Sequence, residues 1–144
     1  MKLQFEKILL SKPEPEQYYG RINKHTDKNG TQMTLHLGSQ FVDITELDGR
    51  IVEFLSMPAK KVLGFRVLEN VKLENMSKLT MRQFKKDKTN NQVSVGIGRF
   101  LQSMDCADAG GKGIKFEIHK GDDQMYGEVY YIELNKPIIK HENN

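Results

Sequence analysis

The sequence has very little cysteine and no long apolar run. A single cysteine, Cys106, stands among 144 residues, so an intrachain disulfide and a Cys-x-x-Cys zinc site are both excluded. No stretch approaches the roughly 18 consecutive apolar residues of a membrane-spanning helix. The first residues (MKLQFEKILLSKPEPE) lack a long apolar core and carry three glutamates, so we do not expect a signal peptide. We therefore expect a cytoplasmic protein that does not contact the membrane.

No charge of one sign dominates the chain. The formal net charge is +3, and charged residues make up 28% of the sequence, which is close to an average soluble protein. A mildly basic balance favours solubility and a weak attraction to polyanions, but it selects no ligand. The length fits one ordinary domain or two small ones, each with a real core.

Short alternating segments separated by turn residues dominate the chain, and they predict a mainly β fold. Asn29-Gly30 is the strongest hairpin signal, because both residues tolerate a positive φ. After it, residues 33–37 alternate and place Met33, Leu35 and Leu37 on one face. The same reasoning predicts further strands at residues 3–8, 18–22, 51–55 and 62–67, with one or two helical turns over residues 41–47.

The pattern recurs about sixty positions later. The segment MTLHLG (residues 33–38) falls on VSVGIG (residues 93–98), and both follow a turn rich in asparagine. A longer glycine turn over residues 107–113 then moves the offset to sixty-three, which aligns Ile51 with Ile114 and Leu55 with Ile118. Turn chemistry, alternation and strand glycines recur in one order, so we interpret the chain as a duplication.

The repeat divides the chain into two tandem β-rich units with short helices, which form a pseudo-dimeric barrel or sandwich. A three- or four-strand unit of this size cannot bury its apolar face alone, whereas two units can share one core. The predicted boundaries are 1–26 for N-terminal strands, 27–68 for the first repeat, 69–86 for a connector, 87–134 for the second repeat and 135–144 for a C-terminal tail.

Residues 33–68 resemble the AbrB-like swapped-hairpin domain, which has a strand, a short helix and then a hairpin. The segment ITELDGRIVEF (residues 44–54) is similar to the family's acidic-glycine turn and Val-Glu strand, and VLGFRV (residues 62–67) resembles its closing strand. Residues 92–134 fit the same outline, although Gly38 and Gly98 stand where family members usually have proline. The resemblance implies a swapped-hairpin fold and DNA binding.

Two basic stretches are the candidate nucleic-acid contacts. RQFKKDK (residues 82–88) holds four cations in seven positions, and RINKHTDK (residues 21–28) is its equivalent in the first unit. Cations neutralise phosphates, and Phe84 would stack on a base if it were exposed; the alternative is a solvated loop with Phe84 in the core. We predict that these two stretches form basic entry loops and that Arg99 extends the surface. The predicted nucleic-acid-binding residues are Arg21, Lys24, Lys28, Arg82, Lys85, Lys86, Lys88 and Arg99.

No arrangement of residues meets the requirements of an active site or a metal site. None of the four histidines stands at ligand spacing from another histidine or from cysteine, and Cys106 has no adjacent basic partner. Gly110-Gly111-Lys112-Gly113 lacks the spacing of a phosphate-binding loop, so it predicts a wide turn. We therefore expect no enzyme activity, no metal and no cofactor.

These observations favour a non-enzymatic DNA-binding or regulatory protein that uses basic loops on a duplicated β-rich scaffold. One alternative is a single-stranded nucleic-acid binder on an OB-like barrel, with Tyr18, Tyr19, Tyr130 or Tyr131 as stacking platforms. Another is a small phage or mobile-element module that grips a host protein through exposed apolar residues. DNA is the favoured partner, and the oligomeric state stays open.

Overall fold

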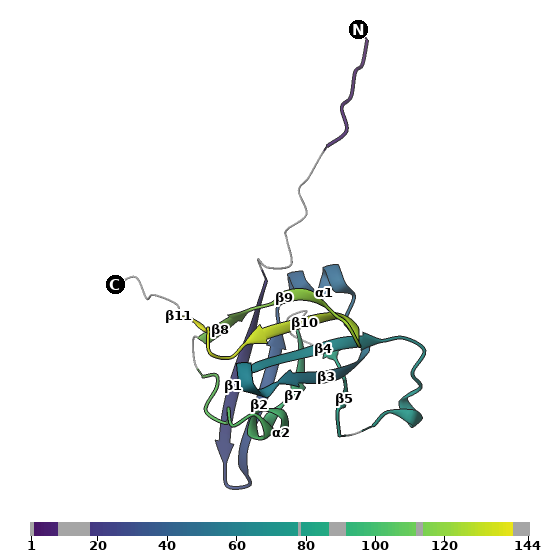
Figure 1. Cartoon of the computed structure of the whole chain (residues 1–144). Helices are drawn as coiled ribbons and strands as arrows, with labels where there is room; N and C mark the ends of the chain where they lie inside the picture. Colours follow the sequence, from purple (N-terminus) through teal and green to yellow (C-terminus); the bar gives the residue numbers. More distant parts are fainter. Residues whose placement is uncertain (1, 9–17, 78, 87–91, 112–113, 140–144) are drawn as a thin grey trace, which may run out of the picture.

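The chain folds into two antiparallel sheets, shown in Figure 1 as a computed structural model that describes residues 2–8, 18–77, 79–86, 92–111 and 114–139. The first sheet has six strands in the order β11 (Ile138–Ile139), β8 (Ile114–Glu117), β1 (Tyr19–Asp27), β2 (Gly30–Leu37), β7 (Val93–Gly96) and β6 (Lys85–Lys86). The second has five, in the order β5 (Met81–Gln83), β3 (Ile51–Met57), β4 (Val62–Leu68), β10 (Gly127–Glu133) and β9 (His119–Asp123).

Four short helical segments connect the strands. The α-helices α1 (Ser39–Thr45) and α2 (Gly98–Ser103) follow β2 and β7, and the 3₁₀ turns η2 (Pro58–Lys60) and η3 (Leu73–Asn75) follow β3 and β4. The predicted mainly β fold with two short helices is confirmed. Neither sheet closes into a barrel, so the sandwich arrangement is the one that forms.

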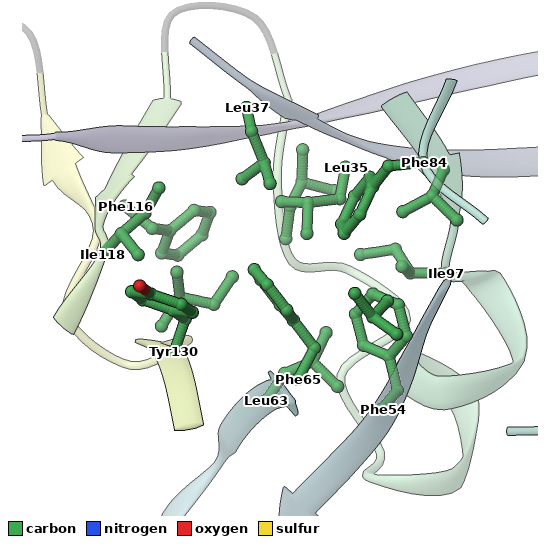
Figure 2. Close-up of a cluster of buried hydrophobic side chains, with 14 of the residues drawn as sticks. Leu35, Leu37, Phe54, Leu63, Phe65, Phe84, Ile97, Phe116, Ile118 and Tyr130 are labelled. Atoms are coloured by element: carbon green, nitrogen blue, oxygen red, sulfur yellow. The ribbon is translucent and has the colours of Figure 1, made fainter. Parts of the chain in front are cut away.

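The core lies between the two sheets and is apolar throughout (Figure 2). The predicted alternation places Met33, Leu35 and Leu37 at 5%, 2% and 1% exposure on the inner face of β2. The facing sheet contributes Phe54, Leu63 and Tyr130, among others. No polar or charged residue is buried in the described part of the chain, so packing of apolar side chains holds the sheets together.

Two strands pass from one sheet to the other at buried residues. The chain leaves β5 and enters β6 at Phe84, and it leaves β8 and enters β9 at Ile118. Both side chains are at most 1% exposed. Where a strand bends and continues in the other sheet, it forms a corner of the sandwich. At both corners here, the side chain at the bend is buried in the core.

The pairing of β2 with β7 is reciprocal between the two halves of the chain. Leu35 pairs with Val95, its counterpart sixty positions later, and Leu37 pairs with Val93. On the other side, Ile97 donates its backbone N–H to the Met33 carbonyl at 2.9 Å. The register therefore centres this strand pair on two equivalent positions of the predicted repeat. In the second sheet β4 and β10 also pair antiparallel, so each sheet contains strands of both halves.

The structure corrects several local predictions. Residues 3–8 form no strand, and Leu3, Phe5 and Ile8 are exposed, because the segment has no strand to pair with. At β3 and β8 the offset of sixty-three is wrong by one residue: buried Val52 and Phe54 correspond to buried Phe116 and Ile118. Both Ile51 and Val52 are apolar, so alternation alone did not show which of them faces inward.

The basic stretches are strands and not entry loops. Residues 21–27 belong to β1, which lies beside β2 and β8, and residues 82–86 make up most of β5 and β6. The predicted connector therefore ends in two strands, and the predicted C-terminal tail contains β11. Lys85 and Lys86 have few neighbouring residues of high β propensity, so pairing with β7 decides their conformation.

Gly110 closes the turn after α2 directly against β1. Its φ is +93°, and a Cβ atom there would lie 2.6 Å from Ile22 Cγ2 and 2.7 Å from the Ile22 carbonyl oxygen. We predict that Gly110→Ala lowers the free energy of unfolding by about 1–3 kcal/mol through overpacking, measured by urea denaturation. Gly127→Ala is the control, since its φ is +77° but nothing lies within 4 Å. Equal losses in both variants would show that strain alone is responsible.

Candidate nucleic-acid interface

Alternation along the strands separates the predicted contact residues. Arg21 and Lys85 lie on the outer face of the six-stranded sheet, because they share cross-strand rows with His36 and Ser94. Lys24 pairs with buried Met33, and Lys86 pairs with buried Val93, so these two side chains leave the backbone on the inner face of the sheet. Neighbours in the sequence therefore do not share one surface.

The remaining predicted residues lie elsewhere. Lys24 approaches Asp108 at 3.8 Å, and Lys28 is exposed in the β1–β2 turn. The guanidinium of Arg82 lies 4.7 Å from the centre of the Phe100 ring, where burial and then the charge of Arg99 lower the pKa of Arg82. Arg99 belongs to α2, so Arg82 and Arg99 form a separate pair at that helix. Lys88 lies outside the described residues.

The aromatic candidates divide in the same way. Phe84 is 0% exposed and packs against the rings of Phe54 and Phe65, so it has no free face for a base. Tyr18 is buried, whereas Tyr19 is 45% exposed on the outer face of β1. In β10, Tyr130 is buried and Tyr131 is partly exposed. Tyr19 is the tyrosine that stands beside a predicted cation, since Arg21 is two positions along the same strand face.

Register places four basic side chains in one line across the outer face of the six-stranded sheet. Arg21 pairs with Lys115 on one side and with His36 on the other, His36 pairs with Ser94, and Ser94 pairs with Lys85. We call this line the basic row; its members, from β8 to β6, are Lys115, Arg21, His36, Ser94 and Lys85. Directly opposite residues in a sheet have neighbouring side chains on one face.

The half of the basic row nearest β8 borders a hollow of about 310 Å³. Arg21, His36 and Lys115 line it together with the amides Gln40 and Gln92. The Nε of Arg21 is buried and donates to no acceptor in the described residues. This atom lacks the partner that a buried donor normally has. Arg21 as a whole is partly exposed where it lines the hollow, so its guanidinium is the group that an anion such as phosphate would contact.

Carboxylates are scarce around the basic row. Two further rows of cross-strand pairs, which contain Tyr19 and Asn23, flank the basic row. Among the described residues, these three rows contain one carboxylate, Glu117. Glu117 stands opposite Tyr19, 4.0 Å from His119 Nε2. The five-stranded sheet differs, since it carries the ion pairs of Glu53 with Arg66 and of Glu128 with Lys120. The positive field of the six-stranded sheet is therefore largely uncancelled near Arg21.

Sequence reasoning missed Lys115 and His36 as members of the site. Lys115 stands alone in the sequence, and His36 reads as one polar position of a half-buried strand. What joins them to Arg21 is the pairing of β1 with β8 and β2, which no local pattern specifies. The signal that was present is the outward position of His36 in the alternation of residues 33–37.

The described residues contain no group of three or more histidine, cysteine, aspartate or glutamate side chains that could hold a metal ion. Among them there is also no helix long and apolar enough to span a membrane. The chemistry that the basic row offers is hydrogen bonding and charge neutralisation, directed at an anionic partner.

Comparisons with known protein families, with curated proteins and with solved structures found no match. The resemblance of residues 33–68 to the AbrB-like domain therefore stays a prediction from the residues.

Proposed function

We propose that this protein is a non-enzymatic nucleic-acid-binding protein and that the outer face of the six-stranded sheet is its contact surface. The observation that carries the proposal is the basic row, with the partly exposed Arg21 lining the hollow beside it. Arginine presents a planar fork of donors that suits phosphate, and the flanking lysines add point charges.

The dimensions of the basic row fit a nucleic-acid backbone. Five neighbouring strands at about 4.8 Å spacing set its two ends roughly 19 Å apart. Such a line of cations contacts several successive phosphates of one strand, and each contact releases a counterion. Ser94 and the amides of the hollow add uncharged donors and acceptors between the charges.

Tyr19 favours a single-stranded partner. Its ring is 45% exposed and stands on the same face of β1 as Arg21, two positions away. Bases of an unpaired strand stack on exposed aromatic rings of a sheet while the backbone follows the cations. A duplex keeps its bases stacked on one another, so it gains nothing from this ring.

Duplex DNA is the second candidate, on a different observation. The pairing of β1 with β8 ends at Arg21, and the pairing of β2 with β7 ends at Thr34, so the rest of the β1–β2 hairpin is a two-stranded ribbon that extends beyond its neighbours (Figure 1). Lys24, His25 and Lys28 are exposed on it. The major groove of B-DNA admits such a ribbon.

Fluorescence anisotropy with three labelled 20-nucleotide probes separates these candidates. We expect single-stranded DNA or RNA to bind at least tenfold more tightly than the duplex of the same sequence at about 50 mM salt, with affinity falling steeply as salt increases. A preference for the duplex would move the contact to the ribbon. Without salt-dependent binding to any probe the proposal fails, and a protein-interaction module, tested by pull-down with and without nuclease, takes its place.

Tyr19→Ala should weaken single-strand binding by about 1–3 kcal/mol, the typical contribution of one stacked base. Tyr19→Phe should retain the affinity because it keeps the ring. Tyr126→Ala is the matched control, since Tyr126 is 39% exposed but lies in the β9–β10 turn of the other sheet. Titration of the same single-stranded probe measures all three variants, and an unchanged affinity of Tyr19→Ala would exclude stacking on this ring.

A further inference from the structure

The outer face of the five-stranded sheet carries a groove of about 550 Å³ that the proposed function does not use. Its walls are mostly apolar: Leu55 and Met57 of β3 face Val129 and Tyr131 of β10, with Tyr126 at the hairpin end. Met57 is 48% exposed and Tyr126 39% exposed. Apolar surface gathered in this way marks a site where another chain docks.

Glycine forms the floor of this groove. A Cβ atom on Gly64 would lie 2.9 Å from Val129 Cγ1 and 3.0 Å from the Tyr130 carbonyl oxygen, so no other residue fits there without movement. Gly121 of β9 also lines the groove without a side chain. One rim is acidic, with Asp122 and Asp123. Asp123 lies on the groove face with Gly121, whereas Asp122 pairs with Glu128 on the other face. Asp123 Oδ1 accepts hydrogen bonds from the N–H groups of Met125 and Tyr126, which leaves Asp123 Oδ2 for a further donor.

Residues 2–8 have the complementary character. This segment (KLQFEKI) has no secondary structure, leads away from the sheets (purple in Figure 1), and exposes Leu3 by 68%, Phe5 by 90% and Ile8 by 80%. In an extended conformation, Leu3, Phe5 and Lys7 point to one side and Gln4 and Glu6 to the other. One side of the segment is thus apolar and ends in a positive charge.

We propose that residues 2–8 of a second copy of this chain lie extended in the groove, so that two copies exchange these segments. Leu3 and Phe5 fill the apolar part between β3 and β10, and Lys7 meets Asp123 at the acidic rim. Alternate side chains of an extended peptide point to one side, so Leu3 and Phe5 can enter the groove together. Exchange between two identical chains is reciprocal, so each dimer contains two filled grooves.

The contact is small, which sets the expected strength. Two seven-residue segments bury less than the roughly 1,200–2,000 Å² of a standard interface, so we expect a dimer with a Kd on the order of 10 µM or weaker. Sedimentation equilibrium of the full chain from about 5 to 200 µM, in the absence of nucleic acid, measures it. This groove lies on the five-stranded sheet, whereas the basic row lies on the six-stranded sheet. The dimer proposal and the nucleic-acid proposal can therefore be supported or rejected separately.

Variants of the full chain test the occupant. Phe5→Asp and Met57→Asp should each weaken dimerisation at least tenfold, because each places a carboxylate in the apolar part. Lys7→Glu and Asp123→Asn should each weaken it less, and asparagine keeps the oxygen that accepts from Met125 and Tyr126. The double variant should recover part of the Lys7→Glu loss, because the new carboxylate then meets no like charge. Leu73→Asp is the matched control, since Leu73 is 61% exposed and does not line the groove.

A labelled peptide of residues 2–8 completes the test. It should bind full-chain Phe5→Asp, whose own segment no longer competes, and it should not bind Met57→Asp. A chain that stays monomeric at 200 µM overturns the proposal, even if the peptide binds, because the segment then docks within its own chain. A dimer that Phe5→Asp leaves intact also overturns it, because another surface then joins the two copies.

Discussion

Arg21→Glu combined with Lys85→Glu should reduce the affinity for single-stranded nucleic acid at least a hundredfold. Both residues belong to the basic row, so the variant removes two phosphate contacts and adds two repulsive charges. Loss of two contacts should also flatten the slope of log K against log salt by about 1.4 for a single strand. Anisotropy titrations between about 50 and 200 mM salt measure both quantities.

The control for this variant uses the alternation of the same two strands. Lys24→Glu with Lys86→Glu changes the formal net charge from +3 to −1, as the first variant does, but at positions that pair with buried Met33 and Val93. We expect at most a few-fold loss of affinity. Equal losses from the two variants would show that overall charge, and not the outer face of the six-stranded sheet, attracts the nucleic acid.

Phe84→Ala should be among the most destabilising single substitutions in the chain. The side chain is fully buried at the corner between β5 and β6, with ring centroids of Phe65 and Phe54 at 5.3 and 6.5 Å. Removal of a buried phenyl ring costs about 3–5 kcal/mol, through lost burial and the cavity that remains. The midpoint of urea denaturation should fall accordingly, and Phe84→Leu should recover part of the loss.

Leu73→Ala is the reference for Phe84, because its side chain is 61% exposed and its removal should change the midpoint little. If Phe84→Ala unfolded at the same urea concentration as the original chain but bound nucleic acid more weakly, Phe84 would be a stacking platform and not a core residue. The two measurements therefore decide between the two interpretations that the sequence left open for this ring.

Local patterns predicted the local structure well. The hairpin at Asn29-Gly30, the inward side chains of residues 33–37 and the helical turns after β2 follow from turn chemistry and periodicity. The offset of sixty positions also marks a cross-strand pair of the six-stranded sheet, Leu35 with Val95. These features depend on residues close together in the sequence, or on two segments that share one pattern.

What the sequence did not predict depends on pairing between distant strands. Alternation at residues 3–8 looks like a strand, yet a strand needs a partner, and none of the described residues pairs with it. Lys85 and Lys86 look like one basic site, but pairing with β7 turns them to opposite faces. Lys115 joins Arg21 only through the register of β8 with β1. The candidate site is made of such pairs, so it emerged only with the fold.

The reciprocal pairing of β2 with β7 and of β4 with β10 also governs how this chain reaches its native state. Contacts between residues sixty positions apart must form before either sheet is complete, which gives the fold a high contact order. Chains of this kind fold in milliseconds to seconds, because long loops close before their contacts stabilise them. Neither half has a sheet of its own to retain, so unfolding should be a single cooperative transition with no stable half-folded species.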